Sequence, residues 1–141
     1  MSEPRRTFWH LAEQVHWDAA LRSGHYDQST LGATLQQVGF IHCSYPEQLP
    51  GVVKLVYSRV SAPLVVLEID PERLAAAAIE VRDEPGDPHL GGPSADNPAP
   101  ELFPHVYGAL PVSAVARTRP AAVERGWLDL APWADTPYPQ E

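Results

Sequence analysis

A short apolar run with a histidine at its centre, from Phe40 to Ser44, constrains the fold more than any other feature of the sequence. Gly39 precedes the run and a Tyr-Pro pair follows it, which is typical of a short β-strand. Alternate side chains of a strand share a face, so His42 should lie on the same face as Phe40 and Ser44. Burying an imidazole without a partner is costly, so His42 must be satisfied internally or face a cavity.

Two other strand-like runs also carry a histidine. Trp9-His10-Leu11 lies near the start, and residues 103–108 contain His105 and Tyr107. Three of the six histidines therefore lie in candidate strands, and we expect His10, His42 and His105 to converge at one end of a sheet. Such a cluster indicates a functional site, although a core histidine with internal hydrogen bonds is the ordinary alternative for each of them.

Other chemistries find less support. Three imidazoles suit zinc with a bound water, but none of these histidines has the short spacing of a His-Glu-x-x-His motif, and we assign no metal. Cys43 should point away from its neighbour His42, so we expect a buried thiol rather than a nucleophile. The sequence has no Gly-x-Ser-x-Gly elbow, dinucleotide fingerprint or phosphate-binding loop.

The order of the predicted elements favours an α+β fold with a mixed or antiparallel sheet and helices packed on it. We expect one domain over residues 1–141, with a core of about 7–119 and a Pro/Trp-rich C-terminal tail at 120–141 forming an irregular flap. The predicted strands are 7–11, 40–44, 64–69, 79–82, 106–110 and 115–118. The predicted helices are 15–23, 31–38, one opened by Ser44 as a cap, and one opened by Asp70, with a long loop at 85–100.

Composition excludes some classes of partner. A net charge of −8 without a dense Lys/Arg run argues against nucleic acid. The sequence has no apolar stretch that could span a membrane and no apolar signal-peptide core at its start, so we expect a cytoplasmic protein. We expect a monomer or a homodimer that binds a small molecule or nucleotide.

Several of these segments together resemble a known bacterial family, domain-of-unknown-function family 952, over roughly residues 7–119. The segments are Trp17-x-x-Ala20, Gly24-x-Tyr26, Ser29-x-Leu31, Gly39 to Ser44, Gln48, the strand 64–70 and Phe103 to Gly108. The resemblance implies a fold similar to ADP-ribosyltransferases, in which a split, mainly antiparallel sheet holds NAD in a cleft.

The resemblance also implies roles for single residues. His10 matches the first-strand histidine that orients a ribose, and Tyr26 is a candidate aromatic wall. No residue lines up with the late glutamate of true transferases, so we expect Glu84 or Glu101 to supply a carboxylate, although a solvated loop charge is the commoner role for such residues. His42 or His105 would be the acid or base.

The remaining residues expected to bind substrate are Ser29, Ser44, Tyr107 and Trp9. We expect NAD or a related nucleotide as the substrate of a transferase or hydrolase, with no tightly bound cofactor. Two alternatives stay open. One is a module that binds a small molecule or partner without catalysis, favoured by the missing late glutamate. The other is an enzyme of specialised metabolism that uses the histidines for acid–base chemistry on an unrelated substrate.

Overall fold

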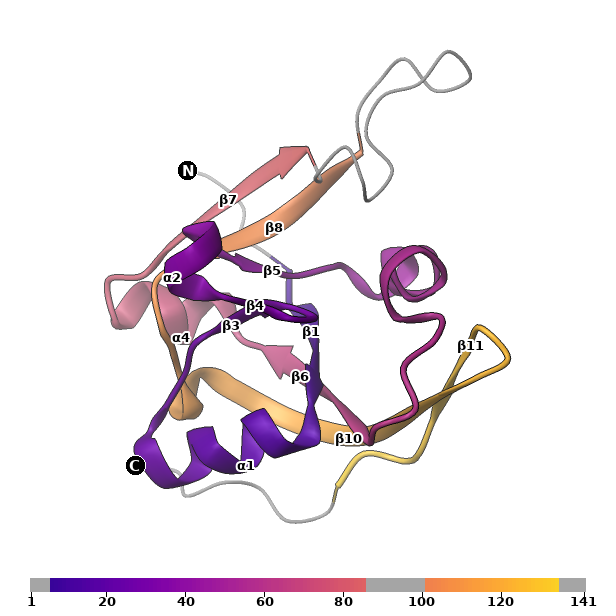
Figure 1. Cartoon of the computed structure of the whole chain (residues 1–141). Helices are drawn as coiled ribbons and strands as arrows, with labels where there is room; N and C mark the ends of the chain where they lie inside the picture. Colours follow the sequence, from indigo (N-terminus) through magenta and orange to yellow (C-terminus); the bar gives the residue numbers. More distant parts are fainter. Residues whose placement is uncertain (1–5, 86–100, 135–141) are drawn as a thin grey trace.

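The computed structural model describes residues 6–85 and 101–134, which form an α+β structure of antiparallel sheets with few helices (Figure 1). The larger sheet has the strand order β1-β6-β10-β11, and the smaller sheet has the order β5-β8-β7. A backbone bridge between Trp9 and Ser44 joins the two sheets. The strands of the larger sheet are β1 (Phe8–Glu13), β6 (Leu64–Ile69), β10 (Val115–Glu124) and β11 (Trp127–Leu130).

Short strands and helices complete the described part of the chain. The smaller sheet consists of β5 (Ile41–His42), β7 (Glu80–Pro85) and β8 (Leu102–Tyr107). The paired short strands are β2 (His25–Tyr26) with β9 (Leu110–Pro111) and β3 (Gln28–Thr30) with β4 (Ala33–Thr34). The helices are α1 (Gln14–Ser23), α2 (Leu35–Val38), 3₁₀ helix η1 (Pro46–Gln48), α3 (Leu49–Val52), π-helix η2 (Val53–Tyr57), α4 (Pro71–Ala76) and 3₁₀ helix η4 (Val112–Ala114).

Local sequence explains where two of the helices begin and end. Gly24 follows α1 with φ 96°, the left-handed conformation that a glycine adopts without a Cβ penalty, as predicted. Asp70 caps α4 by accepting a hydrogen bond from the Glu72 amide at 2.9 Å, and Pro71 occupies the first helical position. β6 is the predicted apolar strand at 64–69, and it lies inside the larger sheet between β1 and β10.

Two hydrophobic cores cover the two faces of the larger sheet. The first core joins the larger sheet to the smaller one, with α1 and α4 packed at its sides; it includes Phe8, Trp17, Ile41, Leu67, Leu74 and Val106. The second core packs α3 and η2 against the opposite face of the larger sheet; it includes Leu11, Leu49, Val53, Tyr57, Leu64 and Phe103. Because β1 contributes to both cores, its alternate side chains are directed to different environments.

Several predicted boundaries are wrong. Of the helix expected over 31–38, only the last turn, α2, is helical. The residues before it form a turn instead, because Gly32 at φ 75° turns the chain back to pair β3 with β4. The helix instead begins at a capping box, in which Thr34 Oγ1 accepts from the Gln37 amide and Gln37 Oε1 accepts from the Thr34 amide. The N-cap after β5 is Tyr45 rather than Ser44, with Gln48 Oε1 accepting from the Tyr45 amide.

The C-terminal part departs most from expectation. The strand predicted at 106–110 lies at Leu102–Tyr107, and the last predicted strand continues to Glu124. The chain then folds back as β11, so a hairpin replaces the start of the expected irregular flap. The long loop predicted at 85–100 lies, apart from residue 85, outside the described residues. No helix within residues 6–85 and 101–134 is long and apolar enough to cross a membrane.

Candidate functional site

The smaller sheet places three polar side chains in one row. His42 of β5 pairs with His105 of β8, and His105 pairs with Arg82 of β7. Residues that are directly opposite on paired strands point to the same face, so these three side chains share a face. Tyr107 and Glu84 lie two residues further along β8 and β7 and therefore share it too. The other face of this sheet belongs to the first hydrophobic core.

The Glu84 carboxylate accepts hydrogen bonds from two other side chains on this face. Glu84 Oε1 accepts a hydrogen bond from His105 Nδ1 at 2.9 Å and a second one from the Tyr107 hydroxyl. These donors, Tyr107 first and then His105, hold the pKa of Glu84 below its usual value. The same bond raises the pKa of Tyr107, so the tyrosine stays a neutral donor beside an ionised carboxylate.

His105 also contacts His42, so hydrogen bonds connect Glu84 to a second buried histidine. His42 Nδ1 and His105 Nε2 are 3.3 Å apart, with both rings buried. His105 Nδ1 must carry a proton to donate to Glu84, which leaves Nε2 as the acceptor when the ring is neutral. His42 is then protonated at Nδ1, and Nε2 is its basic nitrogen. Glu84, His105 and His42 therefore form a relay that fixes the tautomer of each ring.

His10 is connected to the relay through the backbone of His42. His10 Nδ1 donates to the His42 carbonyl oxygen at 2.7 Å, and His10 Nε2 lies 2.8 Å from the Tyr26 hydroxyl. Burial lowers the pKa of His10 to about 4, although the backbone hydrogen bond opposes this shift, so the ring is neutral at pH 7. Burial also raises the pKa of Tyr26, so its hydroxyl donates to His10 Nε2. His10 thus holds β5 against β1 and β2.

Aromatic rings pack around the relay. Phe40 stacks on His105 with 4.0 Å between ring centroids, and Phe103 lies 5.1 Å from His42. The Arg82 guanidinium lies over the Tyr107 ring at 4.4 Å from its centroid and forms an ion pair with Glu80. These contacts restrict the rotamers of both rings of the relay, which keeps the geometry fixed.

The side chains of β7 are partly exposed, whereas the histidines of β8, β5 and β1 are all buried, with His105 of β8 the most buried. The Arg82 and Glu84 side chains are 50% and 31% exposed, whereas His42 is 7% and His105 is 1% exposed. His10 is 2% exposed and has partners on both ring nitrogens. A ligand would therefore reach Glu84 and Tyr107 first and His42 only at depth. This arrangement can accept a proton at His42 and hold negative charge at Glu84.

Three other predicted site residues, Trp9, Ser44 and Ser29, lie on β1, after β5 and on β3. Trp9 lies on the opposite face of β1 from His10, where its indole Nε1 donates to Glu68 and its ring packs against Trp133. Ser44 is buried and pairs with Trp9 through the backbone. Ser29 is buried, and its hydroxyl has no hydrogen-bond partner within the described residues.

The two carboxylates proposed as replacements for the late glutamate lie in different places. Glu84 contacts the relay, whereas the Glu101 carboxylate is exposed and accepts a hydrogen bond from Gln48 Nε2 at 3.2 Å. Arg82 was not predicted as a site residue. The sequence feature that could have indicated it is the alternation of Glu80, Arg82 and Glu84, because alternate residues lie on one face of a strand.

Metal binding has no geometric support in the part of the chain that the structure describes. No group of three or more His, Cys, Asp or Glu side chains there is arranged to hold a metal ion. Hydrogen bonds instead occupy both ring nitrogens of His10 and of His105, and Nδ1 of His42. Cys43 is buried, as predicted, and burial raises the pKa of its thiol.

The described residues thus form an α+β protein. Its two main antiparallel sheets are joined edge to edge, beside a cluster of hydrogen-bonded histidines. The chain belongs to the family described as Protein of unknown function (DUF952), whose model matches residues 11–118. The match covers nearly the same stretch as the predicted resemblance. No curated protein matches the chain.

Solved structures support the fold. The chain is similar to the crystal structure of protein CC0527 from Caulobacter crescentus, with a TM-score of 0.66 and 24% sequence identity. That likeness covers 88% of this chain and 94% of the other. A double mutant of CC0527 matches over the same shares of both chains, with a TM-score of 0.65. At this identity the likeness shows the fold alone.

Proposed function

We propose that this protein is an ADP-ribosyltransferase-like enzyme that cleaves the bond between nicotinamide and ribose in NAD or a related nucleotide. The observation that carries the proposal is the ionised Glu84 carboxylate, held by His105 and Tyr107 on a face that leads to His42. Glycosyl transfer at a ribose develops positive charge on the sugar, and a fixed carboxylate stabilises that charge. Glu84 would thus replace the late glutamate of true transferases.

Each residue of the relay has a distinct role in this chemistry. The bond between ribose C1′ and the nicotinamide nitrogen breaks, and nicotinamide leaves with the bonding electrons. Glu84 stabilises the ribosyl cation, and Tyr107 and His105 keep the carboxylate in place and ionised. An attacking water or acceptor hydroxyl forms the new bond to C1′ and loses its proton to His42 Nε2. His10 positions β5 and takes no part in proton transfer.

Two matched glutamate variants test the proposal. Glu84→Gln removes the negative charge with little change in shape, and we expect it to lower the rate of nicotinamide release from NAD by about 100-fold or more. Glu101→Gln makes the same change on an exposed glutamate that bonds to Gln48 instead of the relay, and it should leave the rate nearly unchanged. The measurement is nicotinamide released over time, with the melting temperature of each variant as a check on folding.

Two outcomes would overturn the proposal. The first is a wild-type protein that binds no nucleotide and releases no nicotinamide. The second is a Glu84→Gln variant that keeps the wild-type rate.

The burial of the relay favours a second candidate, a binding module without catalysis. His42 and His105 are almost wholly enclosed, and a general base must touch the proton that it removes. On this account the relay holds the sheet rigid, while Glu84, Tyr107 and Arg82 bind a ligand. Calorimetric binding of NAD or ADP-ribose with no product formed would select this candidate over the first.

A further inference from the structure

A hairpin at the far end of the larger sheet carries features that the proposed site does not use. β10 and β11 pair closely up to Glu124 and Trp127, and Arg125 and Gly126 make the turn with φ values of 53° and 81°. Turns with two positive φ values match the twist of paired strands and produce tight hairpins. Figure 1 shows this hairpin extending away from the smaller sheet.

β11 is an edge strand without the usual protection. It is last in the order β1-β6-β10-β11, and no other strand of the described chain pairs with its outer side. Edge strands normally avoid pairing with other chains through charges, prolines or bulges. β7, the edge of the smaller sheet, follows this rule with Glu80, Arg82, Asp83, Glu84 and Pro85. β11 reads Trp-Leu-Asp-Leu and has a single charge.

Trp127 adds a large apolar surface to this edge. It is 76% exposed, the most exposed of the large hydrophobic side chains in the described residues. The surface is hollowed beside it, with a volume of about 410 Å³ between the turn and the residues Pro50, Gly51 and Lys54. An exposed tryptophan on an unprotected strand is typical of an interaction surface.

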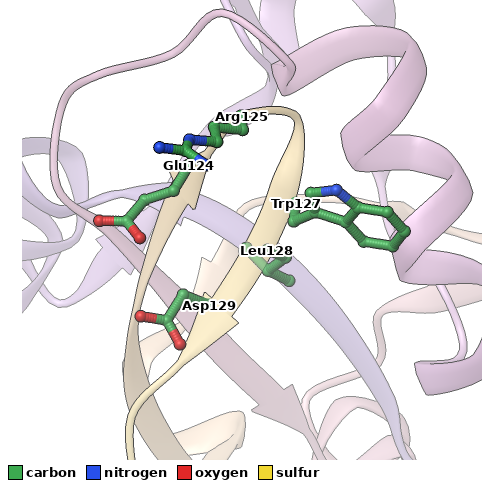
Figure 2. Close-up of a pocket in the computed structure, with 5 residues that line it drawn as sticks. All are labelled: Glu124, Arg125, Trp127, Leu128 and Asp129. Carbon is green, nitrogen blue, oxygen red and sulfur yellow. The ribbon is translucent and has the colours of Figure 1, made fainter.

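Charges of both signs flank the tryptophan. In the view of Figure 2 the Glu124 and Asp129 carboxylates are directed to the left and the Trp127 ring to the right. Strand alternation places Trp127 and Asp129 on the same, exposed face of β11. Lys54 and Arg125 line the hollow, and Figure 2 shows the Arg125 guanidinium directed toward Glu124. A two-fold interface uses the same patch on both subunits, so the patch must complement itself. Cationic and anionic side chains around one apolar centre meet that condition.

We propose that β11 is a homodimer interface, in which it pairs antiparallel with β11 of a second copy of this chain. A two-fold axis perpendicular to the sheet requires that residues directly opposite each other lie on the same face. Pairing centred on Leu128 meets this requirement and places Trp127 opposite Asp129 of the partner subunit. Pairing centred on Asp129 would place two carboxylates face to face, so Leu128 is the axis residue.

The test measures the mass of the full chain against concentration by analytical ultracentrifugation. The wild type should approach twice its 15.5 kDa as the concentration rises. Trp127→Glu should remain a monomer with an unchanged melting temperature, because that side chain is exposed. Val15→Glu makes the same change at another exposed apolar residue, on α1, and should dimerise like the wild type.

A cross-linking variant tests the register independently. Leu128→Cys should form a disulfide-linked dimer under mild oxidation, whereas the wild type should not, because its single cysteine is buried. A wild type that is monomeric at every concentration would overturn the proposal. A dimer that survives Trp127→Glu and does not cross-link through Leu128→Cys would also overturn it, because the contact would then lie elsewhere.

Discussion

His10 shows how a residue can belong to a candidate site by sequence and to the core by structure. Its ring is buried, donates from Nδ1 to the His42 carbonyl oxygen and accepts at Nε2 from Tyr26. The resemblance matched His10 to a histidine that touches a ribose. Because both ring nitrogens have partners within the fold, we propose that His10 positions β5, and its contact with a ribose stays a prediction.

The lowered pKa of His10 makes the stability of the protein depend on pH. Its pKa falls from 6.5 to about 4 on folding, so the unfolded chain binds more protons between these values. His10 therefore contributes stability above pH 6.5 that is lost as the pH falls toward 4, about 3 kcal/mol in all. His10→Asn can keep a donor toward His42 but cannot titrate, so it should remove this part of the pH dependence.

Urea unfolding of both proteins between pH 7 and pH 4.5 measures the effect. The informative quantity is the difference in slope between wild type and variant, because it does not depend on the absolute cost of the substitution. Equal slopes between pH 6.5 and pH 5 would show that His10 has an ordinary pKa and would contradict its enclosure.

At the level of helices and strands, the sequence predicted an element correctly where neighbouring residues alone determine its boundary. Gly24, Asp70 and the apolar run of β6 are three such cases. The predictions were wrong where pairing between strands determines the structure. The residues around Gly32 have a helix-like apolar spacing, yet the pairing of β3 with β4 overrides it.

For the relay, the sequence predicted the histidines but not the carboxylate that joins them. Three histidines in strand-like runs predicted a cluster, and the structure links all three. Which carboxylate joins them could not be predicted, because the choice between Glu84 and Glu101 depends on the register of β7 against β8. A slip of one residue would have directed Glu84 to the other face.

The capping box of α2 allows a quantitative test at the scale of one element. Thr34→Ala removes the hydroxyl that accepts from the Gln37 amide, so we expect a loss of about 1 kcal/mol in the free energy of unfolding. Thr34→Ser keeps the hydroxyl and should lose much less. Chemical denaturation measures both variants, and equal losses would show that the cap does not hold this turn.

At the scale of the whole molecule, two antiparallel sheets meet where β1 bridges to the chain after β5. The first core lies between the sheets, and the relay occupies the opposite face of the smaller sheet. The β11 edge lies on the larger sheet, so the proposed interface and the proposed catalytic residues belong to different elements. Mutations at one should leave the other unchanged.

Nitrogen NMR of the histidine rings at pH 7, with and without NAD, reports both the tautomers and the nucleotide site. We expect a proton on Nδ1 and none on Nε2 of His10, and NAD should shift the His42 and His105 signals while leaving those of His10 nearly unchanged. A His10 ring protonated on Nε2 would contradict the hydrogen bonds that fix the site. NAD that shifts none of the ring signals would contradict the proposed nucleotide site.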